Sequence, residues 1–171
     1  MIKTNKKGFT LIELLVVIAI IGMLSTIVLV SLGSVRKKGR DTKRVADARE
    51  LQLALEMYYD SNRAFPTALS SLTSGGYIQT LPKDPLTQAD YFYAGLQVTG
   101  GTAGTCASYH LGVKLEDTLN TALLNDTDAS GGTVCTGGGT EFNGTSVSCD
   151  TTAGTPSGQT GSTEQCYDIK P

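Results

Sequence analysis

The most constraining feature of the sequence is an apolar run near its start. Residues 9–32 form a stretch of 24 residues whose only charged side chain is Glu13. As an α-helix this stretch would be about 36 Å long, and the hydrocarbon core of a bilayer is about 30 Å thick. The sequence therefore predicts a helix that spans a membrane.

The start of this run differs from an ordinary secretory signal. Such a signal has an apolar core of about 7 to 15 residues followed by a small-residue cleavage site, whereas this core is longer and no Ala-x-Ala site follows it. Three lysines instead lead to Gly8, directly before the apolar run. Hydropathy alone is compatible with a plain N-terminal anchor.

Glu13 is unusual in this setting, because a carboxylate inside an apolar span costs on the order of 3 kcal/mol. One interpretation is that it reaches the membrane interface near the positive end of the helix dipole. The other is that it pairs with a cation at the same depth. No residue between 9 and 35 is cationic, so that cation would come from another chain or from a newly made N-terminus.

The string KKGFTLIELLVVIAIIG resembles the type III signal of type IV pilin-like proteins. The resemblance implies cleavage between Gly8 and Phe9 by the prepilin peptidase, followed by N-methylation of Phe9. It also implies that Glu13 pairs with the N-terminal ammonium of a neighbouring subunit when filaments assemble. Pairing two buried charges would select the correct axial register between subunits.

Charge is strongly segregated along the chain. Seven of the 14 basic residues lie between positions 36 and 49, whereas residues 51–171 contain four basic and twelve acidic residues, a formal charge of −8. An acidic surface of this kind disfavours nucleic-acid binding. The basic cluster suits either a solvated collar that attracts anionic lipid or contacts with acidic heads of neighbouring subunits. The positive-inside rule, applied to the cations on the two sides of the apolar run, places the C-terminal part in the cytoplasm. The basic leader before Phe9 and the four cysteines of the C-terminal part favour the outside instead.

Helical periodicity continues beyond the apolar run. Apolar residues recur at three- and four-residue spacings on one face, namely at Val45, Ala48, Leu51, Leu55 and Tyr58. One helix is therefore expected over residues 9–59, transmembrane in its first half and amphipathic in its second. Asn62 and Pro66 end it, and a short helix is expected over residues 67–73.

Two alternating segments, YFYAGLQV and CASYHLGVKLED, predict strands of a small antiparallel sheet packed on the apolar stripe. The expected fold class is α+β, with a loop-rich C-terminal region braced by disulfides. The expected division is a leader (1–8), a membrane or filament-core helix (9–35), an amphipathic stalk helix (36–60) and a globular head (61–171). Phe65-Pro66 and the loop over residues 81–85 also resemble pilin-like subunits of type II secretion and many bacterial type IV pilins.

The second half of the head is rich in Gly, Thr and Ser, and we expect surface loops that contribute little core. Its four cysteines, Cys106, Cys135, Cys149 and Cys166, have no C-x-x-C spacing. In an exported chain they predict two disulfides. Three connectivities exist, and loop length favours Cys106 with Cys135 and Cys149 with Cys166. The family resemblance supports only the second pair.

An acidic run matches the opening of a calcium loop, with oxygen ligands at alternate positions and a glycine at the sixth. The candidate ligands are Asp117, Asp126, Asp128 and Ser130, and Glu116 or Glu141 could complete the shell. The match fails at position 12, which is Gly137. The alternatives are a structural calcium ion, which the family resemblance makes relevant, and a solvated acidic turn. No cofactor is required.

Catalytic motifs are absent from the sequence. The single histidine, His110, lies in a strand-like segment with no nucleophile or metal partner in a sequence motif, so we interpret it as structural and the chain as no enzyme.

The sequence thus predicts a structural subunit of a type IV pilus-like filament. Its precursor would reside in the cytoplasmic membrane with the head outside, and its partners would be copies of itself, the prepilin peptidase, the assembly machinery and membrane lipid. The main alternative is a type II secretion pseudopilin in a periplasmic pseudopilus. A DNA-binding minor pilin and a membrane-anchored enzyme are weaker alternatives.

Overall fold

A computed structural model describes residues 8–97, 105–127, 132–142, 144, 149 and 165–171, without the side chains of residues 27–31. The chain divides into two compact units, Met1–Lys37 and Lys38–Pro171. We call the second the globular unit. It contains most of the expected stalk as well as the expected head.

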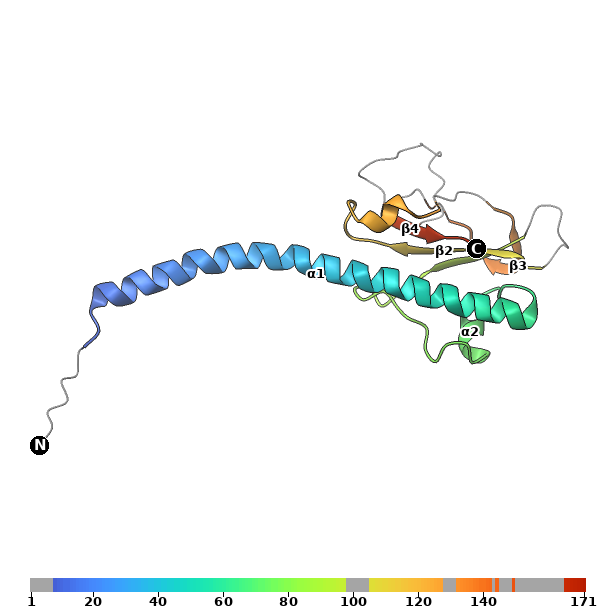
Figure 1. Ribbon diagram of the computed structural model, residues 1–171, viewed down its shortest axis with the longest axis horizontal. Helices are drawn as coiled ribbons and strands as arrows, with labels where there is room; N and C mark the ends of the chain where they lie inside the picture. Colours follow the sequence, from blue (N-terminus) through green and yellow to red (C-terminus); the bar gives the residue numbers. More distant parts are fainter. Residues whose placement is uncertain (1–7, 98–104, 128–131, 143, 145–148, 150–164) are drawn as a thin grey trace, which may run out of the picture. The chain divides into compact units, whose positions relative to one another are not determined.

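Helix α1 covers Leu11–Asn62 and runs through both units (Figure 1). It ends at Arg63, which adopts a left-handed conformation (φ 57°) and donates its backbone N–H to the Tyr59 carbonyl at 2.7 Å. The helix expected over residues 9–59 is confirmed to within three residues at each end. Within the described part of the chain, no helix combines the length and the apolarity needed to cross a membrane.

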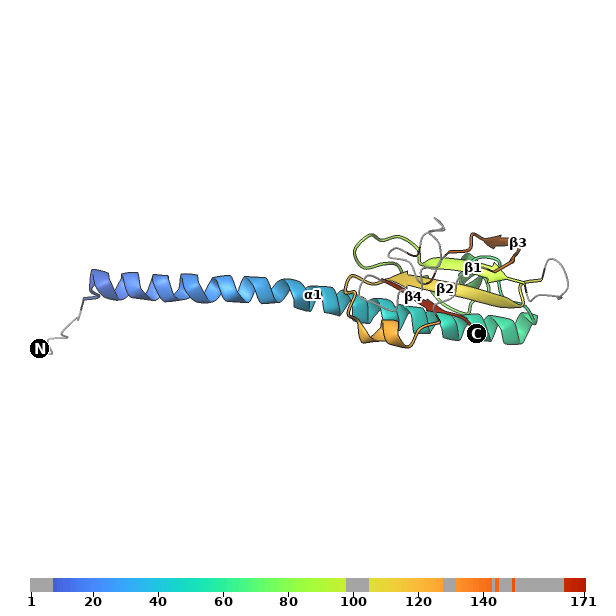
Figure 2. The same cartoon turned by 90° about the horizontal axis from the view of Figure 1, so that it is seen from above.

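The globular unit contains one antiparallel sheet in its described residues, with strand order β3-β1-β2-β4. The strands are β1 (Phe92–Leu96), β2 (Ser108–Lys114), β3 (Val134–Gly139) and β4 (Cys166–Ile169). A short helix, α2 (Ser70–Ser74), and a 3₁₀ helix, η1 (Thr121–Leu124), complete the elements. The sheet lies beside the C-terminal part of α1 in both views (Figure 2).

Strand β2 is central and is covered on both faces. Alternate residues from Tyr109 to Leu115 join the apolar stripe of α1 in the main core, which confirms the predicted stripe. The opposite face carries His110 and Gly112 beneath Phe142, whose ring a Cβ on Gly112 would approach to 2.5 Å. Phe142 forms a second, smaller core with Cys149 and Cys166.

The C-terminal half, expected to be loop-rich and to contribute little core, contains more regular structure than expected. It contributes strands β3 and β4 and the second core. Strand β3 has the sequence VCTGGG, which local propensity disfavours, and β4 has only four residues. Long-range pairing with β1 and β2 stabilises them instead.

Two disulfides brace this region, Cys106–Cys135 and Cys149–Cys166. This is the pairing that loop length favours. Two glycines make room for the first bridge: a Cβ on Gly95 would lie 2.9 Å from both sulfurs, and one on Gly138 would lie 2.6 Å from the Cys135 sulfur.

Candidate functional site

The predicted processing site lies directly before helix α1. Gly8 and Phe9 are exposed, and the Phe9 side chain is 82% accessible. Thr10 and Glu13 then form a reciprocal cap at the start of the helix. The Glu13 carboxylate accepts from the Thr10 backbone N–H at 2.9 Å and its hydroxyl at 2.8 Å, while the Thr10 hydroxyl accepts from the Glu13 N–H at 3.3 Å.

Thr-x-x-Glu at a helix start is the capping-box pattern, so the sequence itself carries a local signal for this cap. In the single chain, Glu13 is thus bound within its own first turn. A partner ammonium would bind a carboxylate whose Oε2 already accepts from Thr10.

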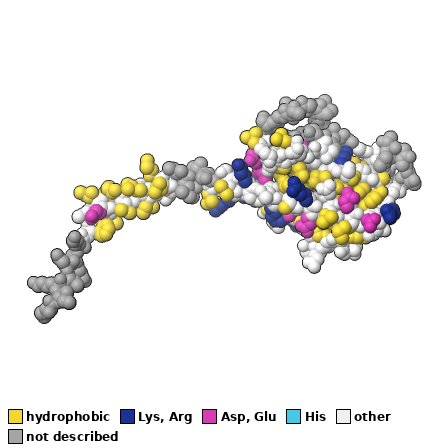
Figure 3. All heavy atoms as spheres, viewed as in Figure 1, with side chains coloured by type: hydrophobic (Ala, Val, Ile, Leu, Met, Phe, Trp, Pro, Cys, Tyr) yellow, Lys and Arg dark blue, Asp and Glu magenta, His cyan; other side chains and the backbone are white. Residues whose placement is uncertain are grey.

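The helix that follows the cap exposes an apolar surface. The large apolar side chains described between residues 11 and 24 are all between 46% and 79% accessible. Figure 3 shows hydrophobic side chains covering this stretch. An apolar surface of this extent marks a region that contacts lipid or another protein.

Two residues of the basic cluster, Arg40 and Arg44, have neither of the two predicted roles. Arg44 is 2% accessible, and its guanidinium contacts three carboxylates of the same chain. It binds Asp84 at 2.6 Å, Asp41 at 2.7 Å and Glu116 at 2.7 Å. Arg40 binds Glu116 with both ends of its fork, at 2.6 Å each. These two arginines therefore hold the globular unit together, because the carboxylates come from three separate segments.

The charges in this cluster shift each other's pKa. Burial opposes ionisation of Arg44, but its three carboxylate partners outweigh burial and raise its pKa above the ordinary value. The hydrogen bond from Arg40 lowers the pKa of Glu116 to about 2, and Arg44 adds to the effect. Burial would raise the pKa of Asp84, yet Arg44 and two backbone N–H groups lower it. Arg44, Asp84 and Glu116 are thus ionised at neutral pH.

Asp84 also organises the loop around it. Its other carboxylate oxygen, Oδ1, accepts from the backbone N–H groups of Leu86 and Thr87 at 2.8 and 2.7 Å, and from the Thr87 hydroxyl at 3.1 Å. The Asp84 N–H donates to the Ala89 carbonyl at 3.0 Å, which closes the loop. The loop over residues 81–90 is therefore fixed to α1 through Asp84 and Arg44.

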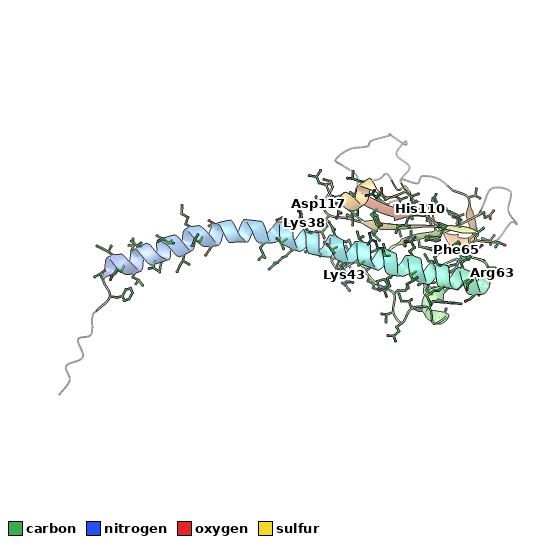
Figure 4. All side chains as sticks on the ribbon, viewed as in Figure 1. Lys38, Lys43, Arg63, Phe65, His110 and Asp117 are labelled. Atoms are coloured by element: carbon green, nitrogen blue, oxygen red, sulfur yellow. A yellow bond between two sulfur atoms is a disulfide. The ribbon has the colours of Figure 1, made fainter. Side chains whose placement is uncertain are left out.

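His110 lies in strand β2, as its strand-like context predicts. It is fully buried, with Nε2 2.7 Å from Asp168 and Nδ1 2.9 Å from Glu141. Its ring stacks on Phe142 at a centroid distance of 3.8 Å. Burial would lower the pKa of His110, but the two carboxylates outweigh it and raise the pKa. Figure 4 shows His110 within the sheet of the globular unit.

The calcium prediction is only partly covered by the structure. Asp128 and Ser130 lie outside the described residues. Asp117 accepts from the Leu119 N–H at 3.1 Å, and Asp126 is half-buried. Glu116 and Glu141, the auxiliary candidates, bind arginines and His110 instead. Among the described His, Cys, Asp and Glu side chains, no group of three is arranged to hold a metal ion, so calcium binding stays a prediction.

Comparison with known proteins points to the same N-terminal segment. The prokaryotic N-terminal methylation motif matches residues 3–29. The type II secretion system core protein G of Aeromonas hydrophila is 31% identical over 137 residues, which cover 64% of this chain and 96% of that protein. The Vibrio cholerae core protein G is 35% identical over 123 residues, covering 63% and 81%.

A type IV pilin is also similar. The type IV wide pilus major component PilA4 of Thermus thermophilus is 40% identical over 76 residues, which cover 44% of this chain and 58% of that protein. The chain therefore belongs to the type IV pilin-like family, as a pilin-like subunit related to the type II secretion core protein G pseudopilins.

Proposed function

We propose that this chain is the repeating structural subunit of a type II secretion pseudopilus and has no catalytic role. The observation that carries the proposal is the exposed apolar surface of residues 11–24, which follows Gly8-Phe9 and the Glu13 cap. Lateral packing of many such helices would remove this surface from both water and lipid. The names of the most fully covered relatives favour the secretion filament.

A surface type IV pilus is the second candidate, because a pilus component is 40% identical over 76 residues. Deletion of the gene distinguishes these two candidate functions. Loss of protein secretion with surface pili intact supports the pseudopilus, and loss of surface pili with secretion intact supports the pilus.

The proposed function requires insertion, cleavage and assembly in that order. The precursor inserts residues 9–35 into the cytoplasmic membrane with the globular unit outside, and the prepilin peptidase removes residues 1–8. The assembly machinery then moves the mature chain from lipid into the filament. The length of the apolar run and the methylation motif at residues 3–29 support this order.

Mass spectrometry of the chain extracted from membranes tests the processing step. We expect a mature N-terminus at Phe9 carrying one methyl group, and four cysteines in two disulfides when no reductant is added. In a host with an active prepilin peptidase, a chain that still begins at Met1 would contradict the proposal.

Replacement of Glu13 by alanine tests assembly. We expect normal membrane insertion and processing but no filaments, because an incoming Phe9 ammonium would lose its carboxylate partner. Thr10→Ala is the matched control, since it removes the hydroxyl of the same helix cap, a change typically worth about 1 kcal/mol, and keeps the charge. Filaments counted by electron microscopy should persist in Thr10→Ala. A normal filament yield from Glu13→Ala would contradict the pairing hypothesis.

A further inference from the structure

A groove runs along one side of α1 in the globular unit. Its floor is α1 and its wall is the segment of η1, and its larger part has a volume of about 500 Å³. Thr42, Asn120 and Thr121 line both this part and a smaller hollow that continues beside Lys38. Figure 4 shows Lys38 and Asp117 at this end of the unit.

The groove combines cations with exposed leucines. Arg49 lines one end and Lys38 the other. Neither has an ion-pair partner among the described residues, although the Asp117 carboxylate shares the hollow with Lys38. Leu119, before η1, is 77% accessible, and Leu124, at its end, is 81% accessible.

A loop protrudes on the other side of α1. The Asp84-centred loop presents Leu86, 60% accessible, and Asp90, whose exposed carboxylate is 3.4 Å from the exposed Lys83 amine. The hydrogen bonds to Asp84 hold the Leu86 backbone in place. A preorganised apolar side chain of this kind loses little entropy when it docks.

The groove and the loop lie on opposite sides of α1. The groove is lined by Thr42 and Arg49, two turns apart, whereas the loop and the strand after it are held by Arg44 and Asp47. At 3.6 residues per turn, the second pair points roughly half a turn away from the first. Figures 1 and 2 both show η1 on one side of α1 and the segment before β1 on the other.

The two surfaces also have the same order along α1. Leu86 follows Asp84, which binds Arg44, and Asp90 precedes Tyr91, which donates to Asp47 at 2.7 Å. On the groove side, Leu119 lies near Lys38 and Thr42, and Arg49 lies further along α1. Two parallel copies placed side by side would thus bring Leu86 to Leu119 and Asp90 to Arg49.

We infer that the groove between α1 and η1 receives the loop over residues 84–90 of a second, parallel copy of this chain, with Asp90 opposite Arg49 and Leu86 against Leu119. A second copy fits the charge, because residues 51–171 carry −8 while Arg49 and Lys38 line the groove without an ion-pair partner among the described side chains. Surfaces on opposite sides of one subunit form a heterologous contact, which repeats without closing unless the rotation makes a ring. The inference rests on the proposed filament and names one of its lateral contacts.

Charge exchange in the full-length chain tests the contact, with filament yield as the readout. Arg49→Glu and Asp90→Lys should each lower the yield about tenfold, because each places like charges opposite each other. The double variant should recover most of the yield. Arg49 and Asp90 lie on opposite sides of α1 within one chain, so recovery must come from contacts between copies.

The controls are Lys114→Glu and Asp60→Lys, the same charge changes at exposed sites outside the two surfaces, and we expect wild-type yield from both. If the wild type assembles and Arg49→Glu and Asp90→Lys assemble equally well, the contact is overturned and the proposed function stands. If the wild type forms no filaments, both fail. Unchanged yield with loss of anionic phospholipid that copurifies with the chain would assign the groove to lipid and overturn the contact.

Discussion

Replacing Arg44 with alanine will lower the free energy of unfolding of the globular unit by about 3–5 kcal/mol, the usual cost of removing one partner of a buried ion pair. The guanidinium binds Oδ2 of Asp84 at 2.6 Å, and it also contacts Asp41 and Glu116. Without it, three carboxylates remain close together in a buried site. Urea denaturation of the full-length chain in detergent, followed by tyrosine fluorescence, measures the loss.

Lys43→Ala is the matched control for this prediction. Lys43 is the preceding cation on α1, is about half exposed and binds Asp47 at 3.0 Å. The Lys43 amine is solvated while Asp47 is buried and keeps its hydrogen bond from Tyr91, so we expect a loss of about 1 kcal/mol. Equal losses from Arg44→Ala and Lys43→Ala would show that the buried arginine adds nothing to a half-exposed pair.

The free energy of unfolding will also fall as the pH rises through the neutral range, because the pKa of His110 is higher in the folded chain than the unfolded value of about 6.5. The imidazolium is stabilised by Asp168 and Glu141 in the folded state, so this contribution is complete below about pH 6.5. It is lost as the pH rises through the folded pKa. The slope can reach about 1.4 kcal/mol per pH unit, the value for one proton.

His110→Gln isolates this contribution. The variant should lose about 3 kcal/mol at pH 6, as expected for a broken buried pair, and its unfolding free energy should be flat where that of the wild type falls. His110 is the one histidine of the sequence. The arginine network does not titrate in this pH range. The lowered pKa values of Asp84 and Glu116 add to the free energy of unfolding above about pH 4, and this contribution is lost in acid. Parallel curves for wild type and variant between pH 6 and 9 would refute the role of His110.

The elements with strong local patterns could be predicted from the sequence. The apolar stripe of α1, including Leu51 and Leu55, has helical spacing, and its residues form the core. Strands β1 and β2 alternate and lie within the expected segments. The short helix expected over residues 67–73 begins three residues later, at Ser70, and ends at Ser74.

Other features depend on partners far away in sequence. Nothing in the run of bases from residue 36 to 49 distinguishes the buried Arg44 from its exposed neighbours, because its partners Asp84 and Glu116 are 40 and 72 residues away. Strand β3 has a glycine-rich sequence and forms through pairing with β1 and a disulfide. The capping box differs from these cases, because Thr10 and Glu13 are only three residues apart. This pattern is local and can be recognised in the sequence.

The two outer strands of the sheet, β3 and β4, affect how readily such subunits aggregate at high concentration. An open strand edge offers unpaired backbone groups that another chain can extend, which is a route to aggregation. Strand β3 has glycines with positive φ at Gly137 and Gly139 and an irregular register with β1, and β4 is only four residues long. Both edges are poor templates for a further strand. Subunits stored at high density in a membrane would therefore resist amyloid-like stacking, which leaves their helices and side-chain contacts to determine how they associate.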